Sequence, residues 1–172
     1  VLTLDDTDRL NSYFGMRSVE LKQGALYLNG KPLFMRTVLD QGFNPDGVIT
    51  APSDEALIFD IQRCKELGFN VLRKHIKVEP LRWYYHCDRL GMIVWQDMVS
   101  GGSHYDPMII QVLPFIGIHL KDNKYHRFGR EEEASRDQFV QDMYDTVELL
   151  YNVTSLAVWV PFNEGWGQFD SL

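Results

Sequence analysis

Two stretches of the chain, Leu67-Gly68-Phe69-Asn70-Val71 and Leu90-Gly91-Met92-Ile93-Val94, decide the fold class. In each stretch a helical pattern ends at a Leu-Gly pair, and an apolar run typical of a strand follows within one or two residues. The same transition occurring twice is typical of consecutive helix-strand units, in which helical crossovers join parallel strands. The sequence therefore predicts an α/β fold with a parallel sheet.

The remaining helices and strands extend this pattern in both directions. Ser53 is the expected N-cap of the first helix, Pro80 is expected to open the second, and residues 131–151 carry the apolar periodicity of a third. Apolar runs predict four parallel strands, over residues 33–39, 69–73, 92–95 and 156–162.

The opening thirty residues follow a different pattern. Residues 13–21 alternate as a strand does, and the pair Asn29-Gly30 after Ala25-Leu26-Tyr27-Leu28 is a strong hairpin signal. This part is therefore expected to form antiparallel β structure.

A long stretch from Met98 to Gly129 has no sustained period and exceeds the usual loop length. Because it follows the carboxyl end of a strand, it forms either a wall over a substrate site or a disordered spacer. Its aromatic residues favour the wall; they are Tyr105, Phe115, Tyr125 and Phe128.

Composition excludes several classes of protein. The chain has 172 residues, with 17 Lys and Arg against 24 Asp and Glu, a net charge of −7 and no basic cluster, which argues against a nucleic-acid partner. No apolar run approaches the ~20 residues of a membrane span. Cys64 and Cys87 have no metal-binding spacing and are expected to be small buried hydrophobes. The compartment, whether cytoplasmic, periplasmic or secreted, stays open.

Polar side chains follow each predicted parallel strand, namely Asp40 and Gln41, Arg73 and His75, Gln96 and Asp97, and Asn163 and Glu164. Each of them alone is an ordinary loop or ion-pair residue. Their repetition at four successive strand ends favours a functional rim. A carboxylate flanked by Asn, Gly and Trp166 suits a carbohydrate, which needs polar fixing groups and a flat aromatic face.

Several motifs together resemble glycoside hydrolase family 2, the β-galactosidase, β-glucuronidase and β-mannosidase group. In chain order they are Phe14-Gly15-Met16-Arg17-Ser18-Val19-Glu20, Leu28-Asn29-Gly30-Lys31-Pro32-Leu33-Phe34-Met35-Arg36, Asn70-Val71-Leu72-Arg73-Lys74-His75, Tyr84-Tyr85-His86-Cys87-Asp88-Arg89-Leu90-Gly91-Met92-Ile93-Val94 and Asn163-Glu164-Gly165. The resemblance implies that residues 1–30 are the last strands of an immunoglobulin-like sandwich with a linker hairpin. It implies that residues 31–172 are the N-terminal half of a (β/α)8 TIM barrel, so that the chain is a fragment.

The resemblance also implies a retaining exo-β-glycosidase, with β-galactosidase the commonest activity. Such enzymes use two carboxyl groups, one as acid and base and the other as nucleophile. Glu164 is the implied acid/base, Asn163 the partner of the sugar 2-hydroxyl and Arg73 the neighbour of the nucleophile. The nucleophile belongs to the seventh strand, beyond this chain. We expect Asp40, His75, Asp97 and Trp166 to complete the substrate-binding set.

The metal ligands of some family members have no counterparts here, so no metal and no cofactor are expected. The alternatives are a β-mannosidase or β-glucuronidase, an endo-acting barrel glycosidase, and a catalytically inactive carbohydrate-binding relative. Because the fragment lacks the nucleophile, it is expected to be inactive alone. Its open strand edges favour association, including a homo-oligomer.

Overall fold

The structure divides into two units, Val1–Phe34 and Met35–Leu172, with a boundary four residues after the predicted one at residue 30. The structure, a computed structural model, describes residues 2–4 and 8–171. Residue 1 and residues 5–7 of the first predicted domain, and residue 172 of the second, lie outside the described part.

The first unit contains two small antiparallel sheets. In one, β1 (Leu2–Leu4) pairs with β2 (Asp8–Leu10). In the other, β3 (Val19–Lys22), β4 (Ala25–Leu28) and β5 (Lys31–Leu33) form a meander. The expected Asn29-Gly30 turn joins β4 to β5, and both of its residues have the positive φ that such a turn requires, +51° and +73°.

Two strand predictions near the start of the chain are wrong in extent. The strand predicted over residues 13–21 begins only at Val19 and ends at Lys22. Its partner β4 ends at Leu28, and the pairing stops where Asn29 bonds to Ser18. The apolar run 33–39 is split between two sheets. Its first residue ends β5, and β6 (Thr37–Asp40) begins four residues later in the second unit.

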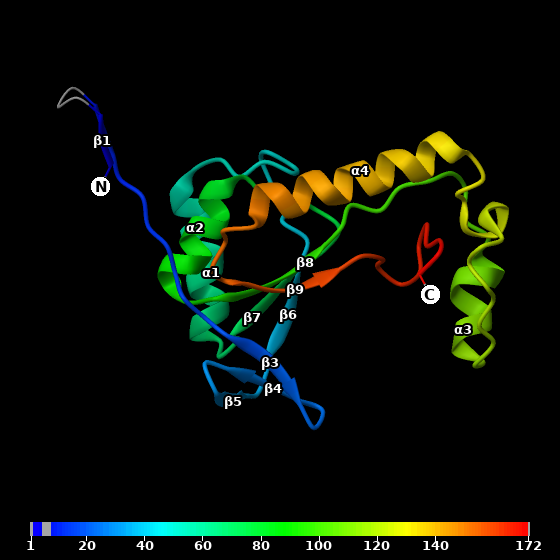
Figure 1. The fold of residues 1–172 in the computed structure, drawn as a ribbon, viewed down its shortest axis with the longest axis horizontal. Helices are drawn as coiled ribbons and strands as arrows, with labels where there is room; N and C mark the ends of the chain where they lie inside the picture. Colours follow the sequence, from blue (N-terminus) through cyan, green and yellow to red (C-terminus); the bar gives the residue numbers. More distant parts are fainter. Residues whose placement is uncertain (1, 5–7, 172) are drawn as a thin grey trace. The chain divides into compact units, whose positions relative to one another are not determined.

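The second unit is built on a parallel sheet in the order β6-β7-β8-β9 (Figure 1). Its further strands are β7 (Val71–Lys74), β8 (Ile93–Asp97) and β9 (Leu156–Val160). All three pairings are parallel, which confirms the predicted α/β class. A register shift between Val94 and Trp95 accommodates one extra residue of β9.

Helices α1 (Asp54–Glu66) and α2 (Leu81–Leu90) lie side by side (Figure 1), and α4 (Glu133–Leu150) leads into β9. The caps follow the sequence, since Ser53 accepts from the Ala56 amide and Gly91 ends α2 at a φ of +67°. A buried apolar core joins these helices to the sheet and contains Leu57, Ile61, Leu72, Trp83, Tyr84, Cys87, Met92, Val94, Leu150 and Leu156. Among the described residues, no helix is both long and apolar enough to cross a membrane.

The long stretch between β8 and α4 is ordered around short helical turns. They are η1 (Met108–Val112), α3 (Leu113–Phe115) and η2 (Tyr125–Phe128). Phe128 is buried, whereas Phe115 is 92% exposed. The stretch is therefore a folded segment with a partly apolar inner side, and Phe115 does not contribute to that side.

Candidate active site

The Arg73 guanidinium, on β7, binds a side chain at the end of β8 and another in the loop after β9. Its Nε and Nη2 donate to the two carboxylate oxygens of Asp97 over 2.9 and 3.0 Å. Nη2 also donates to the Asn163 amide oxygen over 2.7 Å. Asp97 is fully buried, Asn163 is 3% exposed and the Arg73 side chain is 28% exposed. This cluster is a rigid, charge-assisted network open to solvent on the arginine side.

The parallel register explains why these side chains meet. Arg73 pairs with Trp95 and Lys74 with Gln96, so Asp97, one residue further, returns to the face of Arg73. Asp97 is the last residue of β8, and Asn163 follows β9 by three residues. The carboxyl ends of β7, β8 and β9 therefore bring the cluster together.

The amide of Asn163 is held in one orientation. Because its oxygen accepts from Arg73, its nitrogen is presented as a donor, and that nitrogen bonds to no residue that the structure describes. A fixed N–H donor beside an arginine suits a hydroxyl or carboxylate oxygen of a ligand.

Glu164 follows directly in a loop of unusual backbone. The φ of Glu164 is +52°. Two glycines of the same loop, Gly165 and Gly167, also have positive φ, at +73° and +66°. A left-handed glutamate costs ~1 kcal/mol or more and is typical of functional sites. The side chain of Glu164 is exposed and forms no hydrogen bond or ion pair with the described residues. The loop thus holds a carboxylate that is available to a ligand.

Trp166 lies in the same loop and packs against the segment that follows β8. Its ring is 5.8 Å from that of Tyr105, at an angle of 39°, and its amide donates to the carbonyl oxygen of Asn163. The Tyr105 hydroxyl donates to the Gly101 carbonyl. Burial raises the pKa of the Tyr105 hydroxyl, which keeps it a neutral donor. The stretch after β8 and the loop after β9 are therefore joined by an aromatic pair.

Arg130 fastens the same two segments and was not identified from the sequence. It is 2% exposed, its Nε donates to the Gly167 carbonyl over 2.8 Å, and its Nη1 donates to Ser135. Burial among the rings of Phe139 and Phe169 lowers its pKa from the usual range. Gly167 lies so close to Arg130 and Gly101 that a Cβ would collide with the Gly101 carbonyl. No local sequence signal marks Arg130, because Gly167 and Phe169, its partners in the loop after β9, are distant in the chain.

Asp40 and His75 do not join the Arg73 cluster. The Asp40 carboxylate pairs with Lys74 over 2.8 Å and accepts from the Gly42 amide. Lys74 lies over the Trp83 ring of α2, so this pair is on the helix-covered face of the sheet, opposite to Arg73. His75 contacts Gln41, at 3.5 Å between side-chain nitrogens.

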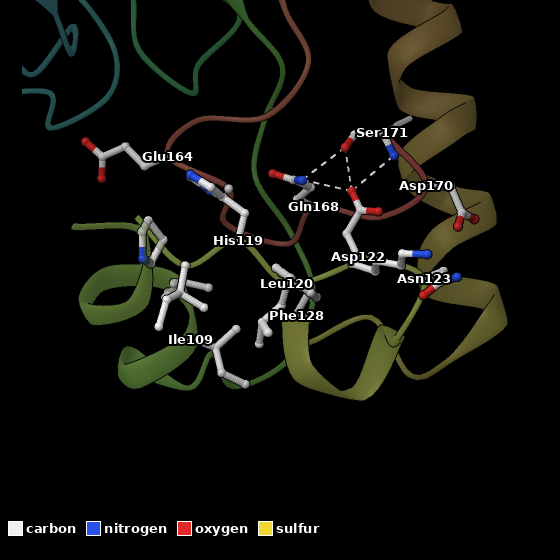
Figure 2. Close-up of a pocket in the computed structure, with 15 residues that line it drawn as sticks. Ile109, His119, Leu120, Asp122, Asn123, Phe128, Glu164, Gln168, Asp170 and Ser171 are labelled. Atoms are coloured by element: carbon white, nitrogen blue, oxygen red, sulfur yellow. Dashed lines mark hydrogen bonds between the residues drawn. The ribbon is translucent and has the colours of Figure 1, made fainter. Parts of the chain in front are cut away.

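A pocket of about 510 Å³ opens next to Glu164. Its walls come from the stretch after β8 and from the loop after β9, and Figure 2 shows Glu164 at one end and Asp122 with Ser171 at the other. Within residues 2–4 and 8–171, no three acidic, His or Cys side chains gather as a metal site would require.

Comparison with known proteins agrees with this architecture. The sequence profile described as "Glycosyl hydrolases family 2, TIM barrel domain" matches residues 19–170. The β-galactosidase of Lactococcus lactis is 36% identical over 84 residues, and that of Photobacterium profundum is 40% identical over 81. These alignments cover 48% and 46% of this chain, and each covers 8% of the relative.

Solved structures show the same fold at lower identity. Parabacteroides merdae β-glucuronidase aligns with a TM-score of 0.63 and 17% identity, over 91% of this chain and 17% of its own. A family 2 β-galacturonidase from Eisenbergiella tayi aligns with a TM-score of 0.69 and 18% identity, over 87% of this chain and 23% of its own. The chain belongs to glycoside hydrolase family 2 and carries part of its TIM barrel domain.

Proposed function

We propose that the chain is the N-terminal half of the catalytic barrel of a retaining exo-β-glycosidase. In this proposal residues 31–172 form the half-barrel, and residues 1–30 form the end of an immunoglobulin-like sandwich with its linker hairpin. The four-stranded parallel sheet and the family match, which begins at residue 19, support the half-barrel. The substrate is a carbohydrate, as the family implies.

The observation that carries the proposal is the pairing of a buried, oriented Asn163 with an exposed carboxylate at Glu164. Glu164 acts as the acid that protonates the departing glycosidic oxygen and then as the base that activates water. Asn163 donates its free N–H to the sugar 2-hydroxyl, where hydrogen bonds strengthen as the oxocarbenium-like state forms. Trp166 offers a flat face to the sugar.

Arg73 and Asp97 act on the sugar side of the bond. Arg73 orients Asn163, and because its side chain is partly exposed, it can stabilise the anionic nucleophile supplied by another part of the barrel. Asp97 holds Arg73 in place. We leave Asp40 and His75 outside the proposed sugar contacts, because their carboxylate and imidazole contact Lys74 and Gln41 instead.

The 172 residues alone are expected to be inactive, because the covalent intermediate requires the missing nucleophile. The sheet ends in β6 on one side and β9 on the other, and such edges favour association or completion by further strands. A homo-oligomer of the complete enzyme belongs to the same proposal. For the sugar we propose a β-galactoside, which the names of the curated relatives support.

The test uses the full product of the gene with Glu164→Gln. Turnover of substrates with poor leaving groups is expected to fall by about 10²–10⁴, because the departing oxygen is no longer protonated. Activated aryl glycosides lose less in the first step, and added azide restores their turnover because it needs no general base.

Glu133→Gln, at the exposed start of α4, is the matched control and leaves both substrates unaffected. Equal loss on poor and activated leaving groups in pre-steady-state glycosylation would contradict the acid role of Glu164. Absence of hydrolysis by the unmodified protein on β-galactosides, β-glucuronides and β-mannosides would favour the inactive carbohydrate-binding relative.

A further inference from the structure

The loop after β9 that carries Glu164 consists of two tight turns. The Trp166 amide donates to the Asn163 carbonyl over 2.9 Å, and the Gln168 amide donates to the Gly165 carbonyl over 3.2 Å. Glu164 lies in the first turn with a left-handed φ of +52°, which residues with a Cβ rarely adopt. Its carboxylate forms no bond with the residues that the structure describes. The position of the carboxylate therefore depends on what holds the backbone of this loop.

The side chain of Arg130 holds the second turn from outside the loop. Its Nε donates to the Gly167 carbonyl over 2.8 Å, and its Nη1 donates to the backbone and hydroxyl oxygens of Ser135, each over 3.1 Å. Ser135 lies in the first turn of α4. The guanidinium carbon lies 4.7 Å from the ring centre of Phe139 and 5.5 Å from that of Phe169. One buried side chain therefore bridges the loop to α4.

This Arg130 bridge is unfavourable for the stability of the fold by itself. The side chain is 2% exposed, and its Nη2 is buried without a hydrogen-bond partner among the described residues. Within residues 2–4 and 8–171, no carboxylate forms an ion pair with it. A buried donor left unpaired on a charged group is more unfavourable than one on a neutral group. An apolar side chain of similar length avoids this penalty, so what Arg130 adds is its hold on the loop.

We propose that Arg130 is a positioning residue for Glu164, which keeps the loop in the conformation that brings the acid within reach of the glycosidic oxygen. This inference rests on the proposed function. An acid must lie about 2.6–3.2 Å from the oxygen that it protonates. A displacement of about 1 Å lowers the rate by about 10²-fold. Gly167 lies three residues after Glu164, so loss of its bond to Arg130 lets the second turn shift and moves Glu164 with it.

The test compares two leaving groups in the full gene product with Arg130→Met, which keeps an apolar stem and removes the hydrogen bonds. Methyl β-galactoside needs protonation of its departing oxygen, whereas 2,4-dinitrophenyl β-galactoside does not. We expect kcat/KM to fall by about 30–100-fold for the methyl substrate, because the acid is displaced, and by no more than about threefold for the dinitrophenyl substrate. A merely structural role would reduce the fraction of folded enzyme and lower both values alike.

Three further variants make the comparison specific. Arg127→Met removes an exposed arginine of the neighbouring η2 and leaves both substrates within about twofold. Ile61→Val weakens the core under α1 away from the loop, and any loss of activity is equal for both substrates. Arg130→Lys keeps the charge but replaces the fork of donors by a single nitrogen, and an intermediate loss on the methyl substrate is expected. Unchanged leaving-group dependence in both Arg130 variants overturns the positioning role.

Hydrogen exchange separates this inference from the proposed function. The Trp166 and Gln168 amides close the two turns, and in a peptide over residues 161–171 their exchange is expected to accelerate about tenfold in Arg130→Met, without change in peptides over α1. If Glu164→Gln shows no dependence on the leaving group, the proposed function fails, and exchange alone decides whether Arg130 holds the loop. Unchanged exchange over residues 161–171 overturns the bridge even if activity falls.

Discussion

Loss of Arg73 is expected to destabilise the sheet because it leaves a buried carboxylate without a partner. The Asp97 side chain is completely buried, and Arg73 is its partner among the described residues, through hydrogen bonds of 2.9 and 3.0 Å. The perturbation is Arg73→Met, which keeps a long apolar stem and removes the charge.

The expected magnitude follows from the burial of the two partners. Removing one member of a buried ion pair costs about 3–5 kcal/mol. Because the Arg73 side chain is 28% exposed, water can enter the vacated site, and we expect the lower end, about 3 kcal/mol. The double variant Arg73→Met with Asp97→Asn is expected to recover about 1 kcal/mol or more, since a buried amide costs less than a buried charge.

The assay is native-state hydrogen exchange in urea on the full gene product, followed in peptides that cover β7 and β8. It measures the opening free energy of this sheet separately from other domains. The matched control is Arg63→Met in α1, whose ion pair with Glu66 is 60% exposed on both sides and is expected to cost at most about 1 kcal/mol. The reasoning is refuted if Arg73→Met costs no more than Arg63→Met, or if the double variant is no more stable than the single one.

Three further predictions concern other parts of the second unit. Gly167→Ala is expected to destabilise the second unit by about 2–4 kcal/mol. Residue 167 has a left-handed φ, which alanine disfavours, and the new Cβ would collide with the Gly101 carbonyl. Gly165→Ala, strained in φ but facing only a flexible side chain, should cost about half as much, and equal melting temperatures would contradict this. The pKa of Asp122 in the folded protein lies below its unfolded value near 3.8. The ionised carboxylate therefore stabilises the folded state fully above that pH, and this contribution is lost as the pH falls below it. Acid unfolding of Asp122→Asn should show a weaker dependence on pH there. Burial raises the pKa of the Cys64 and Cys87 thiols, which lowers their reactivity. Cys87 is fully buried and should react with Ellman's reagent only when the protein unfolds. Cys64 is half-buried and should react before unfolding, but slowly.

Local signals in the sequence determined the order and type of the main elements. Ser53, Pro80 and Gly91 mark helix ends through backbone chemistry that acts within a few residues, so the structure places the ends of α1 and α2 as expected. The repeated Leu-Gly transition determined the parallel sheet for the same reason. Strand extent was less predictable, because a strand ends where its partner ends, as at Ser18.

For the candidate site too, the sequence predicts which residues lie at strand ends but not which of their side chains meet. The sequence placed Arg73, Asp97 and Asn163 near strand ends, and the structure brings these three side chains together. It also placed Asp40 at a strand end, but the parallel register turns that carboxylate toward Lys74 on the helix-covered face. One residue along a strand reverses the face, so position at a rim does not decide which side chains meet.

Only the tertiary structure identified Arg130 and the pocket beside Glu164. One partner of Arg130, the Gly167 carbonyl, lies 37 residues away, and the pocket combines η1 with a loop more than forty residues later in the chain. No local pattern encodes such contacts, because they arise when separate segments pack against one another. Local sequence patterns therefore predict the fold class correctly, whereas packing between distant segments decides which polar side chains at the strand ends meet.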